Sequence, residues 1–336
     1  MKRNLISILL PVRNAGKYLS ACLESIQNQT ETNWELIAID DNSTDSSFEI
    51  LSLFSRKLPE QIHVFKNEGK GIIPALRLAY SKCQGEFITR MDADDLMEKN
   101  KLASLRSLLV KNGRGHVATG LVKYFSETKL GEGYKKYEEW LNSLILENKS
   151  YDDIYKECVI PSPSWMCYQD DLKKCGAFEI QQYPEDYDLC FRFYKHNLKV
   201  VASKNVIHYW RDYSNRTSRT DPNYANQHYF ELKLPYFLEL DYDENRPLVI
   251  WGAGKKGKQL AKKLVGQKID FHWFSNNEKK NGKMIYDKLV QHFEKINQLE
   301  KPQIIVSVAS PEGQIEILDF FYKRQMIKGE DYFFFT

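Results

Sequence analysis

Three carboxylates arrive within four residues at Asp92-Ala93-Asp94-Asp95, directly after an apolar run at residues 86–91. Carboxylates crowded this closely repel one another unless a cation or solvent relieves the repulsion. Oxygen ligands at this spacing suit Mg²⁺ or Mn²⁺ carrying a diphosphate. The alternative is a solvated acidic turn that caps the following helix, and the motif alone does not decide between the two.

Two more acidic pairs accompany this cluster. Asp40 and Asp41 follow an apolar run at residues 34–39, and Glu185 and Asp186 follow a proline. A carboxylate such as Asp41 can accept a hydrogen bond from a ring N–H, and one such as Asp186 can take a proton from an attacking hydroxyl. Acids behind a proline also favour the start of a helix, so capping is the alternative for the second pair.

The elements that would position these acids alternate along the N-terminal third. Apolar runs predict strands over residues 5–10, 34–39, 62–65 and 86–91, and helical spacing predicts helices over residues 17–29, 46–58 and 72–83. Repeated strand–helix units imply a mostly parallel sheet with helices on both faces. Ligands bind at the carboxyl ends of such strands, where the first two acidic groups lie.

The middle of the chain is less regular. Residues 124–150 are polar and aromatic, with an expected loop at 131–133, and residues 211–222 have the composition of a charged loop. Further predicted elements are a helix from residue 185, strands at 200–202 and 206–210, and a helix at 224–240. These patterns predict a first domain at residues 1–222, a helical linker at 223–245 and a second domain at 246–336.

The second domain restarts the strand–helix pattern. A strand at 248–251 leads into Gly252, Gly254 and Gly257, and a helix at 258–264 follows, which is the setting of a dinucleotide-binding glycine loop. Strands at 269–274 and 303–308 and a helix at 315–324 complete a small Rossmann-like α/β domain. An NAD site also needs an acid about 20 residues further on, where this chain has Ser275-Asn276-Asn277. NAD binding is therefore doubtful, and a structural use of the domain stays open.

Composition excludes several classes of protein. A length of 336 residues suggests two domains, and a net charge of +3 argues against nucleic acid as a partner. The sequence has no apolar run near the ~20 residues that span a bilayer, and the short run at residues 5–10 fits a strand better than a signal peptide. Six scattered cysteines indicate reduced thiols in the cytoplasm.

The N-terminal region resembles the family 2 glycosyltransferases, inverting enzymes with a GT-A-type nucleotide-binding α/β domain. The resemblance covers about the first 220 residues and depends on five motifs in a fixed order. The motifs are Pro11-Val12-Arg13-Asn14, Asp40 to Asp45, Gly85 to Asp95, Glu185 to Leu189, and His208-Tyr209-Trp210-Arg211 with Ser218-Arg219. Five motifs in this order are far more specific than one.

The resemblance implies a site for a nucleotide-diphosphate sugar. Its implied donor-binding residues are Pro11, Arg13, Asp40, Asp41, Arg77 and Asp92, with Asp41 on the base and Asp40 either on the donor or orienting the loop. The implied ligands of Mn²⁺ or Mg²⁺ are Asp94, Asp92 and His208. Alternatives stay open for Asp95 as a helix cap, His208 as a half-buried strand histidine and Arg77 as a surface charge. A basic loop with Arg211, Arg216 and Arg219 would close over phosphates or be solvated.

The resemblance also implies the reacting groups. Asp186 is the implied general base, Glu185 the implied contact to the acceptor, and Trp165 an acceptor-side aromatic. Relatives often carry His-Pro where this chain has Ser162-Pro163, so the acceptor contacts are in doubt. An aromatic face can stack on a sugar, but a buried tryptophan is the alternative.

The expected protein is therefore a cytoplasmic, metal-dependent inverting glycosyltransferase. It would move a sugar from a nucleotide donor, UDP-linked by preference, to a glycan or lipid-linked acceptor in surface polysaccharide assembly. Peripheral association with the inner face of the membrane and a homo-oligomer are both open. The rivals are an NAD-linked or sugar-nucleotide-modifying enzyme using the glycine loop, and a non-catalytic sugar-nucleotide-binding scaffold.

Overall fold

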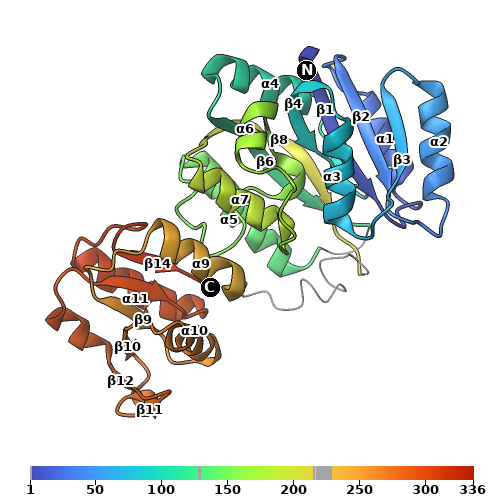
Figure 1. Cartoon of the computed structure of the whole chain (residues 1–336). Coiled ribbons are helices and arrows are strands. Elements are labelled where there is room, and N and C mark those ends of the chain that lie inside the picture. The colour runs from blue at the N-terminus through green and yellow to red at the C-terminus, as the bar shows by residue number, and fades with distance from the viewer. Residues whose placement is uncertain (1, 128–129, 215, 217–228) are drawn as a thin grey trace. The chain divides into compact units, whose positions relative to one another are not determined.

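The structure is a computed structural model that describes residues 2–127, 130–214, 216 and 229–336. The chain forms two compact units (Figure 1). The first comprises Met1–Tyr151 and Val159–Ala225, and the second comprises Asp152–Cys158 and Asn226–Thr336. The second unit therefore contains a short segment from the middle of the chain.

The first unit is built on an eight-stranded sheet of order β3-β2-β1-β4-β7-β6-β8-β5. The strands are β1 Lys2–Val12, β2 Trp34–Asp40, β3 Ile62–Lys66, β4 Gly85–Arg90, β5 Leu96–Met97, β6 His116–Phe125, β7 Met166–Tyr168 and β8 Lys199–Arg211. Strands β3, β2, β1 and β4 are mutually parallel, as are β6 and β8, while β7 runs antiparallel to β4 and β6. The predicted mostly parallel sheet is confirmed.

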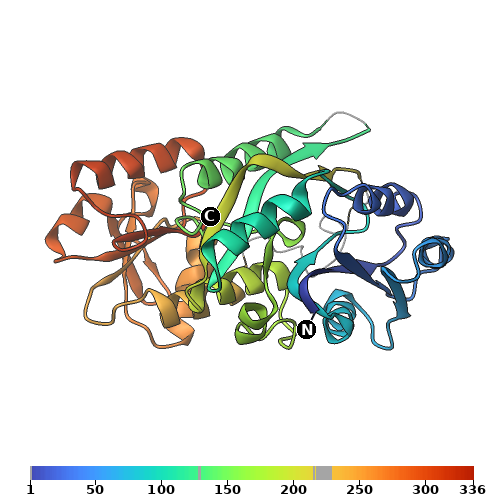
Figure 2. The same cartoon turned by 90° about the horizontal axis from the view of Figure 1, so that it is seen from above.

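Helices cover both faces of this sheet, as the view in Figure 2 shows for the N-terminal strands. The helices are α1 Leu19–Gln27, α2 Ser47–Lys57, α3 Ile72–Lys82, α4 Lys101–Asn112, α5 Glu132–Leu146, α6 Gln169–Lys174 and α7 Glu185–Lys195. All seven residues of β2 are buried, which a strand covered on both faces requires. Across the part of the chain that the structure describes, no helix has the length and apolar character needed to cross a membrane.

Two local expectations were wrong, and one open alternative does not hold. Helix α5 occupies most of the region expected to contain a loop, because Leu141, Leu144 and Ile145 bury one face of it. The two strands expected at 200–202 and 206–210 are one irregular strand, β8. Asp95 does not cap the following helix, because β5 intervenes and α4 begins only at Lys101.

The second unit is a smaller α/β domain with strand order β11-β12-β10-β9-β13-β14. Its elements are α9 Phe230–Leu240, β9 Leu248–Trp251, α10 Lys255–Gly266, β10 His272–Ser275, β11 Met284–Ile285, β12 Lys288–His292, β13 Gln303–Val306, α11 Pro311–Lys323 and β14 Tyr332–Phe334. Strands β12, β10, β9, β13 and β14 are parallel, and their order of appearance across the sheet, 3-2-1-4-5, is that of doubly wound nucleotide-binding folds. Helix α9, expected within a separate linker, belongs to this unit.

Candidate active site

The acidic motifs lie at the ends of elements of the first unit. Asp40 ends β2, and the cluster at residues 92–95 follows β4, which lies two strands away in the sheet with β1 between them. Glu185 and Asp186 form the first turn of α7. The carboxyl ends of β2 and β4 therefore present acids along one edge of a parallel sheet, which is where such sheets bind ligands.

Arg90, the last residue of β4, joins two of the acidic motifs. Its Nη2 lies 3.0 Å from Oδ1 of Asp92, and its Nη1 donates to Oε1 of Glu185 at 3.0 Å. Arg90 and Glu185 are 3% and 5% exposed, so this pairing is shielded from water. Burial acts to lower the pKa of the guanidinium, but the charges of Asp92 and Glu185 outweigh it and raise the pKa above its usual value, so Arg90 stays charged. The arginine thus fixes the implied donor-side and acceptor-side acids relative to each other.

Asp94 carries a carboxylate that is short of compensating charge. Burial and the neighbouring Asp95 raise its pKa to about 6. The hydroxyl of Tyr213 donates to Oδ2 of Asp94 at 2.9 Å, and Nε of Arg211 donates to its backbone oxygen at 2.8 Å. A desolvated carboxylate beside other carboxylates is a group whose charge a bound cation would stabilise.

Asp95 and His208 form a buried pair. Nε2 of His208 lies 3.0 Å from Oδ2 of Asp95, and its Nδ1 lies 3.4 Å from Nζ of Lys101. All three side chains are fully buried, and the backbone N–H of Arg211 donates to the other oxygen of Asp95. Burial and Lys101 hold the pKa of His208 well below its usual value. The imidazole is therefore neutral, donating to Asp95 and accepting from Lys101.

This arrangement is at odds with His208 as a metal ligand. Both ring nitrogens already have partners, and the ring has no exposed surface. His208 instead holds Asp95 and the end of β8 in place. The buried strand histidine considered above as the alternative is closer to the structure, although the burial is complete.

The remaining acids fit a divalent cation that also binds a diphosphate. Among residues with described positions, no set of three His, Cys, Asp or Glu side chains converges to hold a metal ion by itself. Mg²⁺-type sites in transferases often use one or two carboxylates and take their other ligands from phosphate and water. Asp94, partly desolvated, and Asp92, 22% exposed, supply two such carboxylates.

Asp186 is anchored at the start of α7. Its Oδ2 accepts a hydrogen bond from the hydroxyl of Ser162 at 2.9 Å, and its Oδ1 accepts from the backbone N–H of Tyr187. Burial, followed by the nearby charge of Glu185, raises the pKa of Asp186 to about 6, while Arg90 opposes that rise. A carboxylate with a pKa slightly below neutral can accept a proton efficiently at neutral pH.

Asp40 and Asp41, at the end of β2, differ from the expectation in which of them is available to a ligand. The carboxylate of Asp41 accepts from the backbone N–H of Gly71 at 2.9 and 3.0 Å and from Nδ2 of Asn67 at 2.6 Å, and Arg13 lies 3.8 Å away. Asp41 therefore holds the turn before α3. Within the described residues, the buried Oδ1 of Asp40 accepts no hydrogen bond. Of the two, Asp40 has the acceptor capacity left for a ligand N–H.

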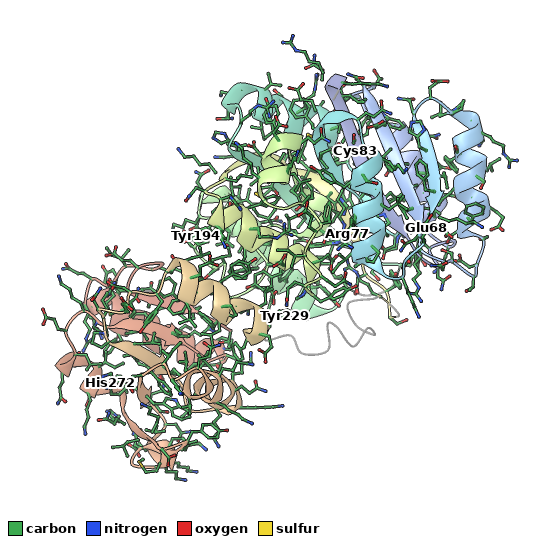
Figure 3. All side chains as sticks on the ribbon, in the orientation of Figure 1. Glu68, Arg77, Cys83, Tyr194, Tyr229 and His272 are labelled. Carbon is green, nitrogen blue, oxygen red and sulfur yellow. The ribbon has the colours of Figure 1, made fainter. Side chains whose placement is uncertain are left out.

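Other predicted residues have different surroundings. Arg77 projects from α3 (Figure 3) and donates to the backbone oxygens of Phe178 and Glu179, so its guanidinium holds that segment. Trp165 is 1% exposed and packs edge-on against Phe193, which rules out sugar stacking in this conformation and fits the buried alternative. Pro11 is half-buried within β1.

The basic loop can be placed only in part. The guanidinium of Arg211 lies 4.5 Å from the ring centres of both Tyr18 and Phe125. Arg216 lies over the ring of Trp210, and the charges of Asp95 and Asp94 help to raise its pKa. Arg219 lies outside the described residues. Two arginines thus lie beside the acidic cluster, where they offset part of its charge.

The sequence profile of "Glycosyl transferase family 2" matches residues 7–176, just over half of the 336 residues. The match includes the β2 acids, Arg90 and the acidic cluster after β4. The chain belongs to glycosyl transferase family 2. It is therefore an enzyme that transfers a sugar from a nucleotide donor.

Relatives support the same assignment. Glycosyltransferase GlyG of Streptococcus pneumoniae is 28% identical over 226 residues, covering 65% of this chain and 74% of GlyG. The putative teichuronic acid biosynthesis glycosyltransferase TuaG of Bacillus subtilis is 30% identical over 157 residues, covering 46% and 59%. The UDP-Glc:alpha-D-GlcNAc-diphosphoundecaprenol beta-1,3-glucosyltransferase WfgD of Escherichia coli is 36% identical over 110 residues, covering 32% and 42%. The match thus spans about half the length of the last two relatives.

Solved structures share the fold. Staphylococcus aureus TarS 1-349 in complex with UDP-GlcNAc aligns with a TM-score of 0.55 at 17% identity, covering 77% of this family 2 chain and 71% of TarS 1-349. The mannosyltransferase PcManGT of Pyrobaculum calidifontis, in complex with GDP-Man and Mn²⁺, aligns with a TM-score of 0.51 at 15% identity, covering 70% and 63%. At these identities the likeness establishes the GT-A-type fold alone, as expected.

The glycine loop of the second unit has three glycines with separate geometric roles. Gly252 has a φ of +126°, which disfavours other residues, and a Cβ on Gly257 would lie 2.0 Å from the backbone oxygen of Gly252. A Cβ on Gly254 would meet nothing within 4 Å. The loop is therefore tightly packed at its ends and open at its centre. The next strand, β10, ends at Ser275 without an acid for a ribose.

This geometry predicts different stabilities for two alanine variants of the glycine loop. Gly257→Ala forces helix α10 away from the loop, and we expect it to lower the free energy of unfolding by about 3 kcal/mol, as other overpacked sites do. Gly254→Ala enters open space and should cost less than about 1 kcal/mol. Urea denaturation of both full-length variants measures the difference. Equal stability of the two variants would show that the loop is not packed as described.

Sequence reasoning missed three residues of the site. Arg90 and Lys101 received no role because a charged residue at a strand or helix end usually faces solvent. Ser162 was noted only as a departure from the family pattern, whereas its hydroxyl contacts Asp186. The one signal in the sequence is Arg90 itself, a charged residue at the end of an otherwise apolar strand that is expected to be buried.

Proposed function

We propose that this family 2 enzyme is a metal-dependent inverting glycosyltransferase that uses a UDP-linked sugar and a glycan or lipid-linked acceptor in surface polysaccharide assembly. The observation that carries the proposal is the buried link from Asp92 through Arg90 to Glu185, beside Asp186. It joins an acid suited to a donor diphosphate with acids suited to an acceptor hydroxyl. The names of TuaG and WfgD, and UDP-GlcNAc in the TarS complex, support the substrate classes. A lipid-linked acceptor would bring the enzyme to the cytoplasmic face of the membrane.

Asp186 is the proton acceptor in this proposal. Its Oδ2, oriented by the hydroxyl of Ser162, removes the proton as the acceptor oxygen attacks the anomeric carbon. Attack from the side opposite the leaving diphosphate inverts the anomeric centre. Glu185 is held by Arg90 and shapes the acceptor side, and Arg90 keeps Asp186 from taking up a proton too readily.

The donor side is formed by the strand ends. Oδ1 of Asp40 has free acceptor capacity for a ring N–H of the base, while Asp41 and Arg13 stabilise the turn beside it. Asp94 and Asp92 would hold Mn²⁺ or Mg²⁺, which when bound supplies positive charge that stabilises the diphosphate leaving group. Arg211 and Arg216 add fixed positive charge beside the same acids.

Titration calorimetry with UDP tests the donor side. We expect Mn²⁺ to tighten UDP binding by at least about tenfold, or about 1.4 kcal/mol, and Asp94→Asn to abolish that gain. Asp170→Asn is the matched control, because Asp170 is about half exposed and pairs with Arg114 on the surface. Equal UDP affinity with and without Mn²⁺ in the wild-type enzyme would remove the metal role given to Asp94.

A further inference from the structure

The chain leaves the first unit for seven residues in its middle. Residues up to Tyr151 belong to the first unit, Asp152–Cys158 belong to the second, and Val159 returns to the first. Both crossings occur about 70 residues before the main connection between the units. These seven residues form neither a helix nor a strand, so their place in the second unit depends on the contacts that their side chains and backbone make there.

Tyr155 is the anchor of this segment. Its ring stacks on Phe335 with centroids 5.2 Å apart and meets Phe237 and Phe333 edge-on at 5.5 and 5.7 Å. Its hydroxyl donates to Oδ2 of Asp241 at 2.5 Å, and the residue is 3% exposed. Buried aromatic contacts of this kind add about 0.5–1.5 kcal/mol per pair beyond the area that they bury.

Polar contacts hold the backbone on both sides of Tyr155. Nζ of Lys233, on α9, donates to the backbone oxygens of Lys156 at 2.8 Å and Phe335 at 3.4 Å. Lys233 is 1% exposed, so its ammonium is committed to these carbonyls and to the nearby charge of Glu157. The carboxylate of Asp153, also buried, pairs with Nζ of Lys328 at 2.7 Å. The second unit therefore grips the segment by stacking of aromatic rings, by hydrogen bonds from Lys233 to backbone carbonyls, and by the ion pair of Lys328 with Asp153.

The same segment leads directly into the acceptor side of the site. Only residues 159–161 separate Cys158 from Ser162, and all three are buried in the first unit. Ser162 then donates to Asp186. The backbone from Tyr155 to Ser162 is therefore held at both ends, by the ring contacts of Tyr155 in the second unit and by the burial of residues 159–161 in the first.

We propose that the C-terminal unit is a positioning module for the transferase reaction, gripping residues 152–158 and thereby fixing the Ser162 hydroxyl against Asp186. Tyr155 and Lys233 are its positioning residues. The coupling follows the chain and needs no ligand in the glycine loop. The role of Ser162 in turnover depends on the proposed function of Asp186, whereas the grip itself does not.

Hydrogen exchange of the full-length protein tests the grip without reference to activity. Tyr155→Ala should make amides of residues 159–166 exchange at least about tenfold faster, while amides of β1 and β2 are unchanged. The control is Tyr322→Ala, which removes a tyrosine of the same unit that is 84% exposed and should leave residues 159–166 unaffected. Unchanged exchange at 159–166 in a folded Tyr155→Ala protein would overturn the proposal.

Kinetics separate positioning from general damage. Tyr155→Ala should lower kcat for transfer by about tenfold and alter the acid limb of its pH profile, with UDP affinity unchanged. Tyr155→Phe keeps the rings and should recover most of kcat. If Tyr155→Ala does not fold, Lys328→Met removes only the partly exposed partner of Asp153 and should show the same exchange pattern more weakly. A parallel fall of kcat and UDP affinity would count against positioning, and absence of transfer by the wild-type enzyme would reject the proposed function while exchange still decides the grip.

Discussion

Replacing Asp186 by Asn should lower kcat for sugar transfer by about 10²–10⁴-fold, the usual contribution of a positioned general base. Asparagine has nearly the same shape and can still bond to Ser162 and to the N–H of Tyr187, so the start of α7 should remain intact. UDP affinity should be that of the wild-type enzyme, because the donor acids lie at the ends of β2 and β4. Steady-state kinetics with a panel of sugar nucleotides, together with UDP calorimetry, measures both quantities.

The role of Asp186 as a base also predicts the direction in which kcat/KM changes with pH. A base acts only when it is deprotonated, so wild-type kcat/KM should fall as the pH drops below about 6, the raised pKa of Asp186. Ser162→Ala removes a hydrogen bond that lowers this pKa, so its acid limb should move to higher pH. The residual activity of Asp186→Asn should lack the limb altogether. Near-normal turnover by Asp186→Asn would assign the proton to another group.

Periodicity was sufficient for the sheet because its signals are local. Strands β1, β2, β3 and β4 are short apolar runs, and α1, α2 and α3 between them carry one-sided apolar faces. Helix α5 was missed for a physical reason. Its buried residues, Leu141, Leu144 and Ile145, all lie in its C-terminal half, and tyrosines occupy part of the rest. The polar composition of residues 124–150 therefore hides the helical spacing of its apolar residues.

The site was predictable only as far as acids follow strands. The sequence places Asp92 after a predicted strand and Asp186 at the start of a predicted helix. Nothing local indicates that Arg90 connects these two motifs, because its partner Glu185 lies 95 residues further along the chain. The division of labour between Asp40 and Asp41 depends on Gly71 and Asn67, which approach from another turn. Residue types therefore predict the chemistry of such a site, while tertiary contacts decide which neighbour performs it.

The excursion of residues 152–158 is the feature least accessible to sequence reasoning. Tyr155 finds its partners more than 80 residues away, on α9 and at the C-terminal end of the chain. No periodic pattern encodes such a pairing, since residues 152–158 form neither a helix nor a strand. A boundary drawn by composition consequently assigned the whole segment to the first domain.

Arg90→Met should be the most damaging substitution in the site. It removes the cation that pairs with both Asp92 and Glu185, and it leaves the buried Glu185 without this guanidinium. Breaking a buried pair in this way costs about 3–5 kcal/mol of stability, whereas Arg114→Met, which removes a half-exposed pair with Asp170, should cost less than about 1 kcal/mol. Urea denaturation of the two variants, compared with the wild-type enzyme, measures this contrast.

The conservative variant separates charge from geometry. Arg90→Lys keeps a cation that opposes the rise in the pKa of Asp186, but one ammonium cannot reproduce the two-sided contacts of the guanidinium. It should therefore keep the acid limb near the wild-type pH while still losing kcat, because Asp92 and Glu185 are no longer fixed to each other. In folded Arg90→Met the acid limb should move to higher pH. If both variants show the wild-type limb and kcat, Arg90 is a packing residue and the link between donor and acceptor acids has no part in the reaction.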